Sequence, residues 1–329
     1  MHSMNNIQIP VVGSFHTDMI EYINKTNRYW IEKVMVYSKE FVDSIALNSC
    51  ATTSNSFSEK LAGMGIHCEH IIVTSVAPDI FQPSKRSTKI RKEVMFDNEK
   101  GFLCVYVGRL SPEKGLNIII EAIQNIGDAY LVIVGDGPSA STFAEMHGKE
   151  NRIYCKPGFL DHVGLAEMYA SSDVHVSASE FETLGNTVLE AHACGIPVVV
   201  PRTQGFCDTV SDSVNGYLFE SGNSSSAGKY LQKIKDDPKL KDRMGKAALK
   251  SIQNNTVLRV VNDLLIWWDF GIKKFEGRNF IYKLVIGSIL CLTIPLAVVS
   301  HAMVSDISKC SYFLSCHVFV ECVGILYIF

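Results

Sequence analysis

The feature that most constrains the fold is a regular alternation of apolar, strand-like runs with helix-like segments in the middle of the chain. The runs are FLCVYVG (102–108), YLVIVG (130–135), RIYC (152–155), VHVSAS (174–179) and PVVVP (197–201). Helical patterns fill the intervals 115–126, 139–147, 161–171 and 185–194. Apolar strands that alternate with helices form a parallel sheet covered on both faces. In such sheets the ligand binds beyond the carboxyl ends of the strands.

The region before residue 83 carries a shorter version of the same pattern. Residues 44–49 and 71–76 are predicted strands, and residues 54–65 are a predicted helix that begins at a serine and stops at a glycine. The polar, basic stretch 83–100 then interrupts the apolar pattern. An interdomain linker or a surface loop has this character.

Composition excludes several functional classes. With 329 residues, of which 47% are hydrophobic and 20% charged, the chain is long enough for one large core or two ordinary domains. The formal net charge of -3 gives no broad attraction for nucleic acid. The 10 cysteines contain no C-x-x-C pair, so reduced, buried thiols and a cytosol-facing catalytic region are favoured over a disulfide scaffold.

An uncharged apolar run, Leu284–Val299, lies near the C-terminus. Residues 280–282 extend it, despite Lys283, to roughly 20 residues, the length of a transmembrane helix. It follows an aromatic and basic collar of Trp267, Trp268, Lys273, Lys274 and Arg278. Such collars mark a water–lipid boundary, so residues 280–300 are predicted to span a membrane; a buried C-terminal helix is the alternative. The apolar stretch 318–329 is too short to span.

A run of basic side chains precedes this region, and a solvated helix face or contact with an anionic membrane surface would explain it. These residues are Lys229, Lys233, Lys235, Lys239, Lys241, Arg243, Lys246 and Lys250.

Polar loops follow four of the predicted strands. In the first, Arg109 and Lys114 lie in the segment GRLSPEKG, which begins at Gly108. Two cations on a strand-to-helix turn can neutralise a diphosphate together, with help from the dipole of the following helix. A solvated basic turn is the alternative.

The second and third loops are short and permissive. Gly135, Asp136 and Gly137 form the second, and Gly158 begins the third. Glycines let the backbone approach a ligand closely, but no third glycine completes a dinucleotide fingerprint. Plain structural turns remain the alternative for both.

The fourth loop pairs two carboxylates, Glu182 and Glu190, with the latter about two helical turns into the next element. Carboxylates that far apart suit separate hydroxyl groups of a sugar and a ribose. The residues between them supply backbone N–H groups at a helix start, where phosphate binds. They are Thr183, Leu184, Gly185 and Asn186.

Taken together, GRLSPEKG, VGDGP and FETLGNTVLEAHACGIPVVVPRTQGFCDTV resemble the retaining GT-B glycosyltransferases of family 4. The resemblance covers roughly residues 11–255. Within the family, these segments are most similar to those of plant and algal sulfoquinovosyltransferases. It implies an α/β fold of the GT-B type with two Rossmann-like domains. It also implies that Arg109 and Lys114 hold the donor diphosphate, that Glu182 contacts the donor sugar, and that Glu190 contacts the ribose.

The resemblance also implies that His16 faces the donor sugar from the acceptor side. A purely structural histidine is the alternative. Neither a D-x-D motif for a metal-bound diphosphate nor a G-x-x-x-x-G-K-[ST] loop is present in the sequence, so we expect neither a metal nor another cofactor. Family members carry about three further strand–helix units before the region of His16, so we expect the N-terminal domain to be incomplete.

These observations predict a domain order. Residues 1–82 are the remnant of an acceptor-side domain, 83–100 a linker, 101–255 the donor-binding domain, 256–279 a juxtamembrane segment, 280–300 a transmembrane helix and 301–329 an apolar tail.

The predicted function is transfer of a sugar from a nucleotide-diphosphate sugar, UDP-linked, to a lipid such as diacylglycerol with retention of configuration. Sulfoquinovosyl transfer in the cytosol or plastid stroma is the finer expectation. A soluble acceptor, a catalytically silent nucleotide-sugar-binding scaffold and another GT-B enzyme are the alternatives.

Overall fold

The computed structural model describes residues 12–16, 49–98 and 100–276. They divide into two compact units, and each is described by itself. Unit 1 contains the described residues of 12–52, 58–71 and 263–276, and unit 2 contains those of 53–57 and 72–262.

Unit 2 is built on a parallel sheet, as the apolar runs predict. Within the described residues the sheet has 6 strands in the order β6-β5-β4-β7-β8-β9, and every pairing is parallel. The strands are β4 (Phe102–Val107), β5 (Ala129–Gly135), β6 (Ile153–Pro157), β7 (Val174–Val176), β8 (Val198–Pro201) and β9 (Gly216–Phe219). The edge strand β9 was not predicted from the sequence.

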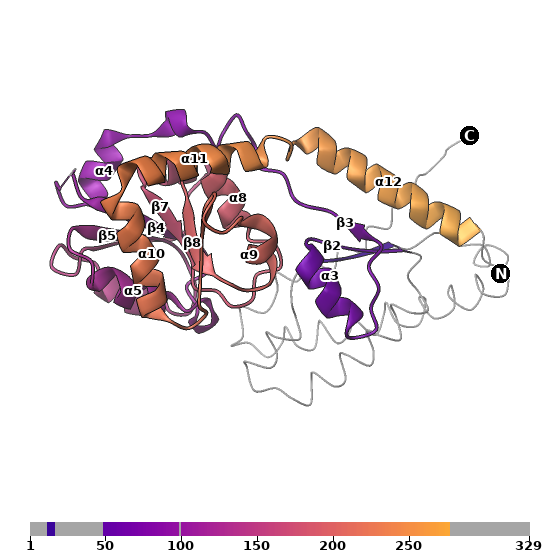
Figure 1. Cartoon of the computed structure of the whole chain (residues 1–329), viewed down its shortest axis with the longest axis horizontal. Coiled ribbons are helices and arrows are strands. Elements are labelled where there is room, and N and C mark those ends of the chain that lie inside the picture. The colour runs from indigo at the N-terminus through magenta and orange to yellow at the C-terminus, as the bar shows by residue number, and fades with distance from the viewer. Residues whose placement is uncertain (1–11, 17–48, 99, 277–329) are drawn as a thin grey trace, which may run out of the picture. The chain divides into compact units, whose positions relative to one another are not determined.

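Helices cover both faces of this sheet (Figure 1). Cys104 and Tyr106 of β4 join a core with α5 (Leu116–Gln124) and α10 (Ser224–Asp236). Leu103 and Val105 of the same strand join a second core with α7 (His162–Ser171) and α8 (Asn186–Ala193). Burying an aliphatic side chain such as Leu103 or Val105 contributes about 1.5–3 kcal/mol, so packing on both faces stabilises the sheet.

Shorter helices and the two C-terminal helices complete the described chain. Their bounds are η1 Pro83–Lys85, α4 Thr88–Val94, η2 Pro112–Lys114, α6 Ala140–Glu145, α9 Gln204–Thr209, α11 Pro238–Ile252 and α12 Val257–Glu276.

The strand order contains a topological switch point between β4 and β7. From β4 the chain continues through β5 to β6 on one side, and β7 then continues through β8 to β9 on the other. Ligands of doubly wound sheets bind in the crevice that opens at such a point, outside the carboxyl ends of the strands. A ligand is therefore expected to contact the loops after β4 and β7.

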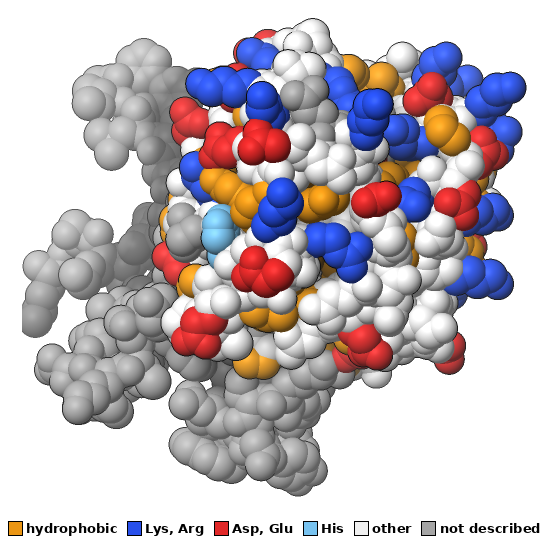
Figure 2. Space-filling view, turned by 90° about the vertical axis from the view of Figure 1, so that its left-hand side faces the viewer, with side chains coloured by type: hydrophobic (Ala, Val, Ile, Leu, Met, Phe, Trp, Pro, Cys, Tyr) orange, Lys and Arg blue, Asp and Glu red, His pale blue; other side chains and the backbone are white. Residues whose placement is uncertain are grey.

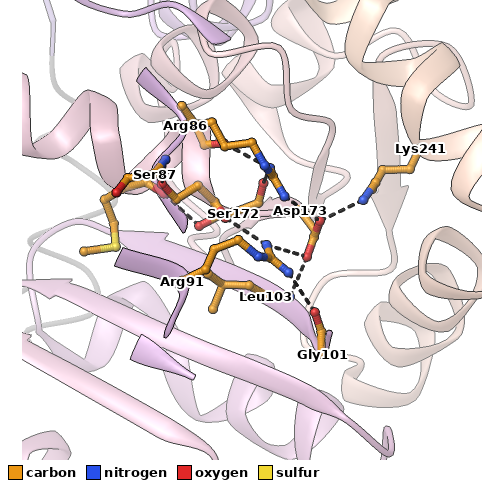
Figure 3. Close-up of polar contacts among 11 residues, drawn as sticks. Arg86, Ser87, Arg91, Gly101, Leu103, Ser172, Asp173 and Lys241 are labelled. Carbon is orange, nitrogen blue, oxygen red and sulfur yellow. Dashed lines mark hydrogen bonds and ion pairs between the residues drawn. The ribbon is translucent and has the colours of Figure 1, made fainter. Parts of the chain in front are cut away.

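A buried ion cluster ties the amino edge of the same sheet together (Figure 3). Asp173, just before β7, accepts hydrogen bonds from Arg91 of α4 at 3.0 Å, from Lys241 of α11 at 2.7 Å and from the Leu103 N–H at 2.9 Å. Arg91 also donates to the carbonyl oxygen of Gly101. The stretch 83–100, expected as a linker or loop, thus contains two helices and belongs to unit 2.

The basic residues of α10 and α11 are mostly exposed, as expected for a solvated face. Figure 2 shows lysine and arginine side chains gathered toward the upper and right-hand margins of one face, with acidic side chains among them. Lys241 differs from the other basic residues, because it pairs with the buried Asp173. Its role is therefore structural rather than that of a solvated charge.

Unit 1 contains a smaller parallel sheet. Its described strands are β1 (Val12–Phe15), β2 (Ser49–Thr52) and β3 (His70–Ile71), in that order. Of the predicted strand 71–76, only Ile71 is in a strand, and residues 72–76 are irregular. The helix predicted at 54–65 is α3 (Asn55–Ala62).

Trp267 corrects the predicted interfacial collar. It is 4% exposed, and its indole Nε1 donates a hydrogen bond to Ser49 Oγ at 2.9 Å. Lys274, another member of that collar, pairs with Glu69. Trp267 therefore packs inside unit 1 instead of lying at a water–lipid boundary, and Lys274 adds an ion pair to the same unit.

Across the described ranges, no helix is both long and apolar enough to cross a membrane. The predicted span at 280–300, the tail 301–329 and most of the predicted strand 44–49 lie outside those ranges.

Candidate functional site

The loop after β4 places two cations at the switch point. The phenol of Tyr106 donates a hydrogen bond to the Arg109 carbonyl oxygen at 2.9 Å, which fixes the backbone where β4 ends. The Arg109 side chain is partly exposed and has no hydrogen bond or ion pair with any described residue. A guanidinium in that position can bind an anion.

Lys114 ends η2 in the same loop and contacts the loop after β7. Its ammonium group pairs with the Glu182 carboxylate and lies 3.3 Å from Ser179 Oγ. The two charged side chains are 24% and 25% exposed, so the pair is accessible to a ligand. The geometry joins two residues that the sequence could only assign to separate roles.

Backbone contacts fix the loop that carries Glu182. The N–H of Gly205 donates to the Glu182 carbonyl oxygen at 2.8 Å, and Thr53 Oγ1 donates to the Thr183 carbonyl oxygen at 3.2 Å. A Cβ on Gly205 would lie 2.4 Å from the Thr183 carbonyl carbon. Only glycine permits this approach, and its role was not predicted from the sequence.

Helix α8 begins at the end of this loop. Gly185 is its N-cap with φ of 81°, and Leu184 beside it is buried. Asn186 opens the helix and accepts a hydrogen bond at Oδ1 from Thr74 Oγ1 at 2.6 Å. The free N–H groups of a helix start and its dipole favour an anion here.

Glu190 lies further along α8 and contacts α7. Tyr169 Oη donates a hydrogen bond to Glu190 Oε2 at 3.0 Å. Burial raises the pKa of the Glu190 carboxyl, and the Tyr169 hydrogen bond acts in the opposite direction. Glu190 is thus a half-buried carboxylate whose described side-chain hydrogen-bond partner is a single neutral phenol.

The glycine loops close the same edge of the sheet. A Cβ on Gly135 would lie 1.9 Å from the Gly108 carbonyl oxygen, so the loops after β4 and β5 can pack only if position 135 is glycine. Asp136 Oδ1 accepts from the Gly137 N–H at 2.7 Å. The Gly158 N–H donates to the Gly135 carbonyl oxygen at 3.1 Å, which adds the third predicted loop to this edge.

A layer of neutral polar groups lies beneath the site. His175 of β7 is 0% exposed, and its Nδ1 lies 3.0 Å from the Val105 carbonyl oxygen. A carbonyl can only accept, so Nδ1 carries the proton and Nε2 accepts from Thr187 Oγ1 at 3.2 Å. Burial lowers the pKa of His175 to about 4, and the ring stays neutral at pH 7.

His16 lies in unit 1, directly after β1. Its Nε2 is 2.9 Å from Ser14 Oγ, and burial lowers the pKa of the ring. Its predicted role toward a donor sugar stays a prediction.

Three contacts of the site were not predicted from the sequence. They are the Lys114–Glu182 ion pair, the Gly205–Glu182 backbone hydrogen bond and the Tyr169–Glu190 hydrogen bond. All three join segments separated by many residues, and periodicity reports only local structure. Within the described residues, no group of three or more His, Cys, Asp or Glu side chains is arranged to hold a metal ion.

Comparison with known proteins agrees with this geometry. The sequence profile of the family "Glycosyl transferases group 1" matches residues 87–251. The chain is 27% identical over 247 residues to sulfoquinovosyl transferase SQD2 of Arabidopsis thaliana, covering 74% of this chain and 48% of that protein. It is 32% identical over 217 residues to a GDP-mannose-dependent alpha-mannosyltransferase of Corynebacterium glutamicum, covering 65% of this chain and 50% of that protein.

Among solved structures, the crystal structure of Anabaena Alr3699/HepE in complex with UDP and glucose is similar in fold. The TM-score is 0.67 at 22% sequence identity, over 79% of this chain and 71% of that chain. The chain spans about half the length of the two curated relatives. The family profile extends from α4 to the end of α11 and includes every candidate site residue of unit 2. The chain therefore belongs to the glycosyl transferases group 1 family, the retaining GT-B glycosyltransferases of family 4.

Proposed function

We propose that the protein transfers a sugar from a UDP-linked donor to a lipid acceptor such as diacylglycerol, with retention of anomeric configuration. The observation that carries this proposal is the convergence of Arg109, Lys114 and Glu182 at the switch point of unit 2, with Glu190 along the adjoining helix. The diphosphate of a nucleotide sugar needs a cationic contact. The hydroxyl groups of its sugar and ribose need groups that accept hydrogen bonds. This edge of the sheet offers both.

In this proposal the residues divide the donor between them. Arg109 and Lys114 contact the diphosphate and stabilise the charge that develops on the departing nucleotide. Glu182 accepts a hydrogen bond from a sugar hydroxyl, and Glu190 accepts one from the ribose. Since Lys114 already pairs with Glu182, a bound donor would share the ammonium group between its diphosphate and that carboxylate.

The lipid acceptor and the membrane attachment are the finer parts of the proposal. They rest on the apolar run at 280–300 and on the likeness to sulfoquinovosyl transferase SQD2. That likeness also motivates sulfoquinovosyl transfer as a specific candidate reaction. Cys104, Cys155 and Cys194 of the described chain are buried free thiols, which supports a reducing compartment such as the cytosol or the plastid stroma.

The test is calorimetric titration of the full chain with UDP-glucose, UDP-sulfoquinovose and GDP-mannose, paired with a product assay on diacylglycerol vesicles. Binding of a UDP-sugar with formation of a glycolipid is the expected result. Glycosylation of a soluble acceptor alone would remove the lipid part of the proposal.

The alternative is a catalytically silent nucleotide-sugar-binding protein. Donor binding without turnover on any acceptor would support this alternative, and absence of binding would overturn both.

A further inference from the structure

We propose that Tyr169 is a positioning residue for nucleotide binding: its phenol holds one oxygen of Glu190 so that the other oxygen can accept from a donor ribose. This inference rests on the proposed function, because it takes Glu190 as the ribose contact. It adds a residue of α7, outside all four predicted loops, to the donor site.

Among the described residues, the Tyr169 hydroxyl has one side-chain hydrogen-bond partner, Glu190. The side chain is 0% exposed, and its ring contacts His175 edge-on at 5.5 Å between centroids and Phe81 at 6.3 Å. These packed neighbours fix the ring. Its Oη then lies 3.0 Å from Glu190 Oε2, so the direction of the donated hydrogen bond is also fixed.

The two oxygens of the Glu190 carboxylate have different surroundings. Its Oε2 is engaged by the phenol, while Oε1 has no hydrogen bond or ion pair with the part of the chain that is described. A carboxylate with one fixed oxygen presents the other in a defined direction. Hydroxyl groups of a ribose are suitable donors for that oxygen, because a carboxylate is an acceptor only.

The hydrogen bond also controls when Glu190 is ionised. Burial raises the pKa of Glu190, and the bond from Tyr169 and the charge of His162, both on α7, lower it. Cys194 at the end of α8 also senses the Glu190 charge, and burial raises its pKa to about 12. Removing the phenol therefore raises the Glu190 pKa and moves the loss of ribose binding to higher pH.

The experiment compares UDP with 2′,3′-dideoxy-UDP by calorimetry at pH 7.5, using the full chain and its Tyr169→Phe variant. UDP affinity should fall about three- to tenfold in the variant, as for one lost hydrogen bond, while dideoxy-UDP affinity stays unchanged. With UDP, the acid limb of the affinity profile should move to higher pH. In a Glu190→Gln background, Tyr169→Phe should add no further loss.

Tyr154→Phe is the matched control, since Tyr154 Oη donates to Glu93 Oε1 at 2.6 Å on the outer strand β6. It should change neither affinity. Equal loss for UDP and dideoxy-UDP in Tyr169→Phe, or no loss for either, would overturn the role of Tyr169 while leaving the donor site intact. If the unaltered protein does not bind UDP, the proposed function itself fails, and the role of Tyr169 fails with it.

Discussion

The amino and carboxyl edges of the unit 2 sheet both carry ion pairs, but they differ in access and in partners. At the amino edge Asp173 is 4% exposed and contacts Arg91, Lys241 and the Leu103 N–H. At the carboxyl edge Lys114 and Glu182 are each about a quarter exposed, and Arg109 has no side-chain partner within the described chain.

This difference teaches how similar residues come to have different uses. A buried charge must be fully satisfied by the protein, because its desolvation is costly. A charge beside open glycine loops can exchange its protein partner for a ligand. The amino edge therefore holds the domain together, and the carboxyl edge is the place for chemistry.

The largest expected effect would break the amino edge. Replacing Asp173 with alanine leaves Arg91 and Lys241 without their shared anion, and breaking such a buried network costs about 3–5 kcal/mol of unfolding free energy. Denaturant unfolding would measure it. The control is Asp269→Ala, which removes an exposed i,i+4 pair with Lys273 and should cost less than about 0.5 kcal/mol. Equal losses in the two variants would contradict the comparison.

The second effect is a loss of stability in mild acid. His175 and His192, the latter on α8, are both 0% exposed. Burial lowers the pKa of His175 to about 4 and that of His192 to about 3, whereas both titrate near 6.5 when unfolded. Between these values the unfolded state binds more protons, so the folded state loses stability as pH falls from about 6.5 toward 4. Unfolding curves across this range would show the decline, and histidine ring titrations by NMR would assign it. A flat profile would contradict the buried, neutral histidine layer.

The ion pairs of Asp173 also make the stability of the fold depend on pH, but in a more acidic range than the histidines. Burial alone would raise the pKa of this carboxyl, but Lys241 and Arg91 lower it overall below its ordinary value of 3.8. Its stabilisation is therefore present above about pH 4 and disappears only as pH falls through the lowered pKa.

The third expected effect is a loss of nucleotide affinity at the carboxyl edge with little change in stability. Lys114→Ala removes a charge-assisted contact to the diphosphate, which is worth about 1.5–3 kcal/mol, or roughly ten- to a hundredfold in nucleotide affinity. Because the Lys114–Glu182 pair is partly exposed, unfolding free energy should change by less than about 1 kcal/mol. Calorimetry with UDP, beside denaturant unfolding, separates the two quantities. A large loss of stability with unchanged affinity would reverse the assignment of the edges.

The fold of unit 2 was largely predictable from the sequence, because its strands are buried on both faces. Runs such as Phe102–Val107 and Ala129–Gly135 are apolar throughout and cannot be amphipathic surface elements. The edge strand Gly216–Phe219 was missed although β7 and β8, which were predicted, are no longer than it. In unit 1 the predicted strand 71–76 overlaps β3 only at Ile71, and most of the predicted strand 44–49 lies outside the described residues.

The charged contacts were less predictable than the elements that carry them. Arg91 and Lys241 look like ordinary surface charges in sequence, and only the fold brings them to Asp173. The position of Trp267 in the sequence led to a wrong prediction. Its position before a basic segment indicated a membrane boundary, but the indole is buried against Ser49.

The most direct test of the central claim is a crystal structure of the protein with UDP. We predict that the diphosphate lies at the carboxyl ends of β4 and β7 within hydrogen-bond distance of Lys114 or Arg109, with the ribose against Glu190. A nucleotide bound at the amino edge or on the basic face of α10 and α11, with the Lys114 loop empty, would contradict the account.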